Sequence, residues 1–342
     1  MLKNFTNQEI EQNEIVKKYF LNAEYNGFDV KCNIYTGNFY LDSFNYFIIN
    51  DNFFSFTNLF SRDNLQNNNH YFTKEFFENF LNKKENFKKF ENVYVLGSNS
   101  ADNYFSNLVQ FFPRIFYNNK KKIRIAIHRN SSLKFRDFIK LILKNRGIEF
   151  SFIYLDEDFY FFHNSEIPQF FNFKHSIQVL KNFLISKTKE KNNSKIYVTR
   201  EDSQYRKIIN EADIIPILKS KGYKVINPRL YSIEEQINIF SNATKIVSPH
   251  GSNLTNIIFC RPGTEIYEIG PIFEKKFEKK FENRYKFIAD INNLKYSRLI
   301  TDSVKIQNHS DLAKRYISED VLKSSNYYNN LIVNVNDFSN LL

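Results

Sequence analysis

The chain has 342 residues, of which 42% are hydrophobic, so it is long enough for two domains of ordinary size with a core in each. Its 48 Lys and Arg residues against 37 Asp and Glu residues give a net charge of +11, which favours anionic partners such as nucleotide phosphates, acidic glycans or lipid head groups. The lysines are dispersed and no helix-turn-helix, RRM or KH signature occurs, so we expect no nucleic-acid partner.

The two cysteines, Cys32 and Cys260, lie far apart and have no metal-ligand spacing, which argues against a disulfide framework and a zinc site. The start of the sequence lacks the apolar core of a signal peptide, and no run of about 18 apolar residues occurs. We therefore expect a cytoplasmic protein. Its positive charge would permit peripheral contact with the inner face of the membrane.

Residues 1–90 are expected to form a small β-rich region. Apolar runs broken by Gly37-Asn38 and by Asn50-Asp51-Asn52 are typical of short antiparallel strands. The expected strands are Phe28–Tyr35, Phe39–Tyr46 and Phe47–Phe54.

Residues 91–190 alternate strand and helix patterns, which predicts a Rossmann-like domain with a parallel sheet. The expected elements are strand Val93–Leu96, helix Ala101–Tyr117, strand Ile123–Ile127, helix Ser132–Arg146, strand Ile148–Leu155 and helix Ser176–Lys189. Lys187–Lys195 is polar and charged, and we expect a hinge there.

Residues 191–300 repeat this alternation and predict a second Rossmann-like domain, while residues 301–342 are expected to pack back on the body, with a helix after Asp311. In the second domain Ser232 and Glu235 form a Ser-x-x-Glu capping box. The expected elements are strand Ile196–Thr199, helix Asn210–Lys219, strand Tyr223–Ile226, helix Ile233–Asn242, strand Lys245–Ser248, helix Ser252–Phe259 and strand Thr264–Ile269.

The stretch from Lys245 to Glu268 carries the strongest functional pattern. A buried strand is followed by the turn Pro249-His250-Gly251 and by a short helix for which Ser252 is the expected cap. Such a turn aims free backbone N–H groups and the positive helix end at an anion, for which phosphate is the obvious candidate. The same pattern also suits a plain strand-to-helix turn with a structural histidine.

Arg200 directly follows a predicted strand, as His250 does. Because the carboxyl ends of parallel strands meet at one edge of a sheet, both side chains should line the same cleft. Arg200, together with Arg206, could hold a diphosphate and stabilise it as a leaving group without a metal ion. The alternative is that Arg200 is an ordinary surface charge.

The order of motifs in this half of the chain resembles glycosyltransferase family 61, the DUF563-type enzymes. The resemblance lies in YVTRED, RKIINEAD, YSIEEQINIF and SPHGSNLTNIIFCRPGTEIYE, which agree with the family in type, order and spacing. It implies a GT-B fold, in which two Rossmann-like domains face each other across a cleft. It also implies an inverting enzyme of bacterial capsule, lipopolysaccharide or other surface polysaccharide synthesis.

The resemblance also implies a set of residues that contact the nucleotide sugar. For Asn210 and Glu211 helix capping is an equally good explanation, and for Glu234 and Gln236 a structural role is as plausible as ribose binding. Glu268 could accept hydrogen bonds from a ribose. The set comprises Arg200, Arg206, Asn210, Glu211, Glu234, Gln236, His250, Gly251, Ser252, Asn253, Leu254, Thr255, Asn256 and Glu268.

The first domain is expected to bind the acceptor, and here the sequence departs from the family. The family pattern Asn-Tyr-Tyr-His-Trp-Leu-x-[Asp/Glu]-x-x-Pro-Arg corresponds to the stretch from Asn103 to Arg114, in which Ser106 replaces the histidine and Gln110 the carboxylate. Asn103, Gln110 and Arg114 are the expected acceptor-side residues. Glutamine cannot take a proton from an acceptor hydroxyl, so another group must be the base or the acceptor differs.

Asp102 and His250 are the candidate catalytic residues, and Asp102 is the expected base. The other candidates for the base are His128, Glu157 and Asp158. Asp156-Glu157-Asp158 also matches an Asp-x-Asp metal signature, but three acidic residues after a strand are more often a solvated loop, so we expect no metal and no cofactor.

Together these patterns predict a metal-independent, inverting transfer of a hexose or pentose from a nucleotide sugar, UDP-linked, to a hydroxyl of a glycan or glycolipid. The alternative is a catalytically silent protein of the same fold that binds a nucleotide sugar or a glycan, which the replacements at Ser106 and Gln110 would explain.

Overall fold

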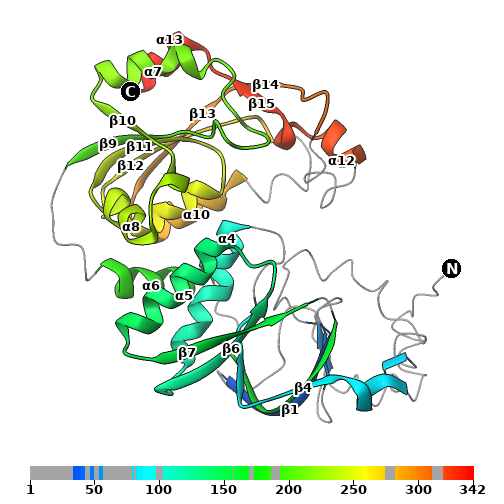
Figure 1. Ribbon diagram of the computed structural model, residues 1–342. Coiled ribbons are helices and arrows are strands. Elements are labelled where there is room, and N and C mark those ends of the chain that lie inside the picture. Colours follow the sequence, from blue (N-terminus) through cyan, green and yellow to red (C-terminus); the bar gives the residue numbers. More distant parts are fainter. Residues whose placement is uncertain are drawn as a thin grey trace. The chain divides into compact units, whose positions relative to one another are not determined.

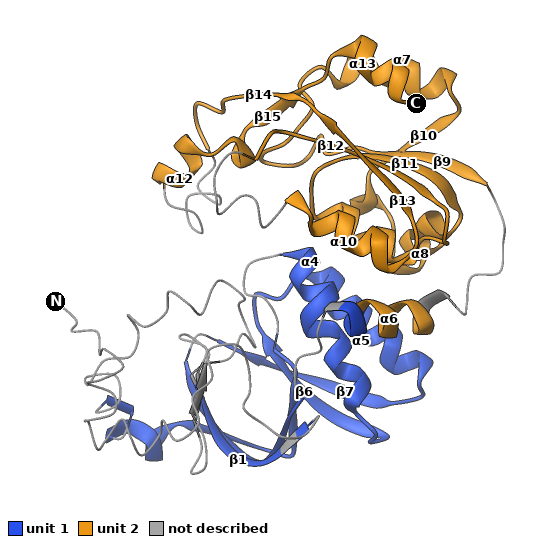
Figure 2. Ribbon diagram, turned by 180° about the vertical axis from the view of Figure 1, so that it is seen from behind, with its two compact units in different colours: residues 1–176 blue, residues 177–342 orange. Residues whose placement is uncertain are grey.

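The structure is a computed structural model that describes residues 34–42, 47–49, 54–56, 79–80, 82–97, 103–156, 158–168, 173–185, 193–273, 282–309 and 319–342. The chain divides into two compact units, Met1–Ser176 and Ile177–Leu342 (Figure 2). Both units contain parallel strands alternating with helices, which confirms the α/β class (Figure 1). The domain limits expected at residues 90, 190 and 300 remain predictions.

The sheet of unit 1 is mixed, and its described strands follow the order β3-β2-β1-β8-β5-β6-β7, with β4 also paired to β8. β5, β6 and β7 are parallel neighbours, while β1 runs antiparallel to β8 and joins the N-terminal strands to the same sheet. The strands are β1 (Ile34–Asp42), β2 (Phe47–Ile49), β3 (Phe54–Phe56), β4 (Lys88–Glu91), β5 (Val93–Val95), β6 (Lys122–His128), β7 (Glu149–Leu155) and β8 (Phe159–Pro168).

The strand break expected at Gly37-Asn38 is wrong. β1 runs through both residues, and its pairing with β8 shifts register between Gly37 and Phe39. A bulge of this kind accommodates an extra residue in a strand without ending it, so a Gly-Asn pair need not be a turn.

The helix expected over Ala101–Tyr117 also differs from the structure. It begins at Tyr104 with Asn103 as N-cap and changes its hydrogen-bonding pattern twice before Tyr117. Pro113, which has no N–H to donate, lies in the last of these pieces. The helical elements up to residue 185 are η2 (Lys84–Asn86), α4 (Tyr104–Ser106), the π-helix η3 (Asn107–Phe111), the 3-10 helix η4 (Phe112–Tyr117), α5 (Leu133–Asn145) and α6 (Phe173–Ile185), which crosses the boundary between the units.

Unit 2 is built on a parallel sheet with the strand order β10-β9-β11-β12-β13. Helices α8, η6 and α10 cover one face, and α7 and α13 (Val335–Leu341) cover the other (Figure 1). The strands are β9 (Ser194–Val198), β10 (Tyr223–Ile226), β11 (Ala243–Pro249), β12 (Glu265–Gly270) and β13 (Lys295–Ile300). The other helices are α7 (Glu211–Ser220), η5 (Pro228–Leu230), α8 (Ile233–Ser241), η6 (Ser252–Phe259) and α10 (Arg284–Ile291).

The predicted capping box at the start of α8 is confirmed. The Ser232 hydroxyl accepts a hydrogen bond from the Glu235 backbone N–H at 3.2 Å, and the Glu235 carboxylate accepts one from the Ser232 N–H at 2.7 Å. The cap predicted for η6 is wrong, because Gly251 occupies the N-cap position and Ser252 is already the first helical residue. The first N–H groups of η6 therefore receive no side-chain cap.

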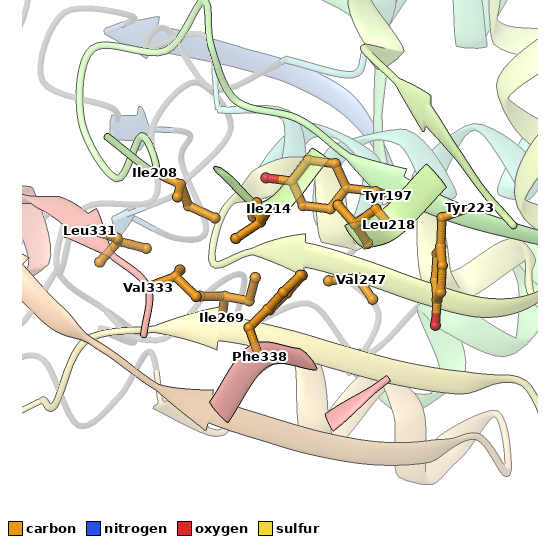
Figure 3. Packing of buried hydrophobic residues seen from close by; sticks show 10 residues of the cluster. All are labelled: Tyr197, Ile208, Ile214, Leu218, Tyr223, Val247, Ile269, Leu331, Val333 and Phe338. Atoms are coloured by element: carbon orange, nitrogen blue, oxygen red, sulfur yellow. The ribbon is translucent and has the colours of Figure 1, made fainter. Parts of the chain in front are cut away.

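The C-terminal segment completes unit 2 instead of forming the single helix expected after Asp311. Its described elements are β14 (Asp302–Val304), α12 (Glu319–Ser324), the 3-10 helix η7 (Asn326–Tyr328), β15 (Asn330–Ile332) and α13. Leu331, Val333 and Phe338 pack with Tyr197, Val247 and Ile269 of the parallel sheet (Figure 3). The end of the chain is thus part of the core of this unit.

We expect Phe338→Ala to destabilise unit 2 by about 3–5 kcal/mol, because it removes a fully buried ring and leaves a cavity against the sheet. Asn340→Ala, on the same helix but less buried, is the matched control and should change stability by less than about 0.5 kcal/mol. Urea unfolding followed by circular dichroism measures both. Equal effects of the two variants would show that α13 does not contribute to the core.

Candidate functional site

The candidate site lies at the carboxyl ends of neighbouring parallel strands in unit 2, which we call the carboxyl edge. In the strand order β9-β11-β12-β13, Arg200 follows β9, His250 follows β11, and Gly270 ends β12. Loops at this edge of an open α/β sheet are where ligands bind in such folds. The structure therefore brings together Arg200 and His250, as the sequence predicted from their positions directly after strands.

Arg200 is buried, with 7% of its surface exposed, yet its guanidinium makes few contacts with other polar groups. One nitrogen donates to the Tyr205 carbonyl oxygen at 3.3 Å, and Nε has no hydrogen-bond partner among the described residues. Gly251 lies directly against it, because a Cβ built on this glycine would stand 1.9 Å from an Arg200 terminal nitrogen. A side chain larger than glycine's at this position would displace the guanidinium.

Arg206, by contrast, is fully engaged in holding the loops of the site together. Its Nε donates to the His250 carbonyl oxygen at 2.8 Å, and a terminal nitrogen donates to the Tyr327 carbonyl oxygen at 3.0 Å. The guanidinium also lies 4.0 Å from the centre of the Tyr327 ring, a cation–π contact. Arg206 connects the loops after β9 and β11 to the C-terminal segment.

The two buried guanidiniums lack a carboxylate partner among the residues that the structure describes. Within the described part of the chain, no carboxylate forms an ion pair with Arg200 or with Arg206. The pKa of Arg200 is lowered to about 10, first by burial and then by the positive charge of Arg206. Uncompensated buried charge is costly, and a bound anion would relieve that cost.

His250 is fully buried and takes part in a polar network with Glu268. Its Nδ1 lies 2.6 Å from Glu268 Oε1, and its backbone N–H donates to the Ile269 carbonyl oxygen at 2.7 Å. The Tyr296 hydroxyl donates to Glu268 Oε2 at 2.5 Å, and Arg298 Nε lies 3.5 Å from Oε1. Glu268 is also fully buried, so its carboxylate is engaged by protein groups and not turned toward the surface.

Aromatic rings surround the imidazole of His250. The ring centres of Tyr285, Phe273 and Tyr327 lie 5.1, 5.3 and 5.7 Å from its own, all in edge-on arrangements. Burial lowers the pKa of His250 to about 4, although Glu268 opposes this shift. A histidine with so low a pKa is a weak proton acceptor at neutral pH, so it is poorly suited to be a general base.

The residues of η6 fall into an outer and an inner group. Ser252 and Asn253, at its start, are half-buried, whereas Leu254, Thr255 and Asn256 are buried. Leu254 belongs to the apolar interior, and Asn256 donates to Gln236 Oε1 at 3.1 Å. Thr255 Oγ1 has no hydrogen-bond partner among the described residues. The start of η6, where no side chain caps the first N–H groups, and the Arg200 guanidinium thus both adjoin Gly251.

The remaining expected nucleotide contacts have structural partners. Asn210 exchanges hydrogen bonds with the backbone of Val333, at 2.9 and 3.0 Å. Glu211 accepts from the hydroxyls of Tyr197 and Thr199 at 2.6 and 2.8 Å. Asn210 therefore ties α7 to the C-terminal segment, and Glu211 holds the end of β9.

In α8, Gln236 is buried and bridges two elements, since it donates to the Tyr231 carbonyl oxygen at 2.9 Å and accepts from Asn256. Glu234 is exposed in the first turn of the helix, where a carboxylate favours the helix dipole. Neither side chain lies in the network around Arg200 and His250 that the hydrogen bonds define.

In unit 1, Arg114 is the most deeply buried of the expected acceptor-side residues. Its guanidinium donates to the Pro168 carbonyl oxygen at 2.8 and 3.0 Å and also to the Leu96 carbonyl oxygen, so it fixes the ends of β5 and β8. Burial lowers its pKa to about 9. Asn103 caps α4 by accepting from the Ser106 N–H at 3.1 Å.

Gln110 lies in the π-helix η3 and is buried, with no hydrogen-bond partner for its Oε1 among the described residues. Ser106 is buried one turn earlier. These are the two positions at which the sequence departs from the family pattern, and both face the interior of unit 1.

Two candidates for the catalytic base, Asp102 and Glu157, lie outside the described residues. His128 is buried, and its Nδ1 accepts from the Asn130 N–H at 3.1 Å, while Asp158 is exposed. Asp156 forms an ion pair with Arg129 at 2.9 Å. The described residues contain no group of three or more His, Cys, Asp or Glu side chains placed to hold a metal ion.

Among the residues of the site that were not expected from the sequence are Tyr296, Arg298 and Tyr327. Tyr296 and Arg298 alternate on β13, and Arg298 stands opposite Glu268 in the register of the sheet. The alternation of large polar side chains in KYSRLI is the signal that could have found them once β13 was placed beside β12. Tyr327 lies in η7, and no periodicity in the sequence predicts that this segment contributes to the site.

No helix of the described residues is long and apolar enough to cross a bilayer.

Comparison with known proteins gives one result at the level of the family. No curated protein matches the chain. The family model described as Glycosyltransferase 61 matches residues 37–267, which is more than half of the chain and includes Arg200, His250 and Gly251. The chain therefore belongs to the glycosyltransferase 61 family, and this membership implies glycosyltransferase activity.

Proposed function

We propose that this protein is an inverting, metal-independent glycosyltransferase that moves a sugar from a UDP-sugar to a hydroxyl of a glycan or glycolipid. The observation that carries the proposal is the buried Arg200 guanidinium, which has no carboxylate partner among the described residues and lies against Gly251 at the start of η6. An anion with several oxygens, such as a diphosphate, fits this combination of guanidinium and backbone N–H groups.

The diphosphate would lie between Arg200 and the first turn of η6. Ser252 and Asn253, both half-buried, can add a hydroxyl and an amide donor there. As the bond from the anomeric carbon to the diphosphate oxygen breaks, negative charge grows on that oxygen, and the fixed positive groups stabilise it. Arg206 acts indirectly, because it holds the backbone of His250 next to this position.

In the proposed reaction, the acceptor hydroxyl attacks the anomeric carbon from the side opposite to the diphosphate, which inverts the configuration there. Unit 1 would bind the acceptor, in a GT-B arrangement, and Asp102 would take the hydroxyl proton. The nucleoside diphosphate leaves with the electron pair of the broken bond. We place the reaction in the cytoplasm, in the synthesis of a capsule, lipopolysaccharide or other surface polysaccharide, where the +11 charge favours anionic glycans and membrane surfaces.

Thermal stabilisation by a panel of nucleotides tests the donor class. We expect UDP and UDP-sugars to raise the melting temperature at millimolar concentration, with or without EDTA, because a ligand that binds only the folded state stabilises it. Uridine, which lacks phosphate, is the matched control and should have little effect. No shift with any UDP compound, or a shift that EDTA abolishes, would contradict the proposal.

A second candidate is a catalytically silent protein that binds a nucleotide sugar or a glycan. It is favoured by Gln110, which stands where the family pattern has a carboxylate and is buried in η3. Under this alternative, UDP-sugars would bind but undergo neither transfer nor hydrolysis. Release of UDP from a UDP-sugar in the presence of the protein, absent in the Arg200→Ala variant, would rule it out.

A further inference from the structure

The carboxylate of Glu268 lies at the centre of a buried cluster of hydrogen-bond donors. Its Oε2 accepts from the Tyr296 hydroxyl at 2.5 Å, and its Oε1 lies 2.6 Å from His250 Nδ1. Arg298 adds a positive charge 3.5 Å from Oε1. One oxygen accepts a hydrogen bond from a hydroxyl and the other lies beside a guanidinium, so Glu268 is the hydrogen-bond acceptor of this cluster.

This arrangement fixes the position of the proton on the imidazole. With Glu268 as the acceptor, the 2.6 Å contact is a hydrogen bond donated by His250 Nδ1, which therefore carries the proton. A neutral imidazole carries a single N–H, so its Nε2 then holds a lone pair and no proton.

The Nε2 atom is buried and has no hydrogen-bond partner among the described residues. The rings of Phe273, Tyr285 and Tyr327 stand edge-on around the imidazole at 5.3, 5.1 and 5.7 Å and hold its plane in one orientation. A buried acceptor without a partner costs roughly 1–3 kcal/mol, which a donor on a ligand would recover.

We propose that Glu268 and Tyr296 are positioning residues that keep the proton of His250 on Nδ1, so that Nε2 accepts a hydrogen bond from a substrate hydroxyl and does not donate one to a phosphate oxygen. The hydroxyl belongs to the ribose or to the transferred sugar. The identity of the ligand rests on the proposed function, whereas the position of the proton does not. Arg200 then carries the recognition of phosphate without help from this histidine.

The charged groups packed around His250 favour the neutral form of its imidazole. The pKa of His250 is lowered to about 4, chiefly by burial, and the positive charges of Arg206, in the loop after β9, and Arg284, at the start of α10, contribute to this lowering. Glu268 on β12 raises it. Arg298 on β13 and the hydroxyl-bearing rings of α10 and η7 complete the set of polar groups packed around it. The ring is therefore uncharged at neutral pH.

Nitrogen NMR of the histidine rings tests the position of the proton directly. The protein contains six histidines, and the signals of His250 are assigned by their loss in His250→Gln. In the wild-type protein we expect a protonated Nδ1 and an unprotonated Nε2 from pH 8 down to about pH 6, where an ordinary histidine with a pKa of about 6.5 is largely protonated. A protonated Nε2 at pH 7 would overturn the proposal.

Variants of the network separate positioning from packing. Glu268→Met keeps a similar volume but removes the acceptor, so the proton should shift in part to Nε2. Tyr296→Phe removes one donor to Glu268 and leaves the carboxylate, so the proton should stay on Nδ1 while the pKa of His250 rises, because the carboxylate loses a stabilising hydrogen bond. An unchanged position of the proton in folded Glu268→Met would also overturn the proposal.

UDP and UDP-glucose identify the donor of the hydrogen bond. A shift of the unprotonated Nε2 signal with UDP indicates the ribose hydroxyl, and a shift only with UDP-glucose indicates a sugar hydroxyl. If both ligands bind through Arg200 and neither moves the Nε2 signal, the role in recognition is wrong while the proposed function stands. If neither ligand binds, the proposed function fails, and the proton position in the free protein still decides whether Glu268 and Tyr296 act as positioning residues.

Discussion

Replacing Arg200 by alanine is expected to reduce sugar transfer by about 10²–10³-fold, the usual loss when one fixed donor to a developing negative charge is removed. Arg200 is the buried guanidinium beside the start of η6, and within the described chain it has no carboxylate to neutralise it. The fold should tolerate the change, since the one hydrogen bond of this side chain to the described residues is that to the Tyr205 carbonyl oxygen at 3.3 Å. Steady-state kinetics and calorimetric UDP binding measure the effect.

Two further variants sharpen this test. Arg200→Lys keeps the charge but loses the planar fork, so it should recover little of the affinity for a diphosphate. Arg124→Ala removes an exposed arginine from β6 and is the matched control, for which UDP affinity should be unchanged. Wild-type affinity for UDP in Arg200→Ala would remove the basis of the proposed function.

The Gly251→Ala variant is expected to slow sugar transfer by about 10²-fold and to weaken UDP binding, although it adds only one methyl group. The added Cβ would stand 1.9 Å from a terminal nitrogen of Arg200 and 2.5 Å from its Cζ, so the guanidinium must move. A displacement of about 1 Å in a positioning group is enough to cost this much. The backbone of Gly251 is extended, with φ of 170°, so the alanine itself causes no backbone strain.

A double variant shows whether the two residues act through the same group. If Gly251→Ala acts by displacing the guanidinium, then adding it to Arg200→Ala should cause little further loss, because residues in contact are not additive. If the loss of UDP affinity in the double variant equals the product of the losses in the two single variants, Gly251 acts independently of Arg200. Circular dichroism of all three variants confirms that they remain folded.

The sequence predicted the strands and helices of unit 2 well up to residue 270, because each buried strand there contains a short apolar run, and β10, β11 and β12 end at or next to Asn, Pro or Gly. β10 was placed without error, and β11 extends only slightly beyond the predicted strand. β13 and β15 were missed because their apolar residues alternate with polar ones or are few, and they are strands only through pairing with β12 and β14. Such pairing depends on the whole sheet and leaves little trace in a local window.

The location of Arg200 and His250 at one edge could be predicted because both follow strands of a parallel sheet. The hydrogen-bond partners of the polar residues at this edge could not be predicted. Glu268 was expected to face a ribose, but the structure pairs it with Tyr296 and His250, and this depends on which strand lies beside β12. His250 and Glu268, which contact each other in the structure, were thus predicted as two separate contacts to the ligand. A sequence does not show which polar side chains form hydrogen bonds with each other.

The contacts of Arg206 have a consequence for how the protein is made. Its backbone N–H donates to the Asn329 carbonyl oxygen at 2.9 Å, and its guanidinium donates to that of Tyr327 and stacks on the Tyr327 ring. During synthesis on the ribosome, the strands that carry Arg200 and His250 emerge well before these partners. The nascent chain should therefore acquire affinity for nucleotide only after η7 and β15 have left the exit tunnel.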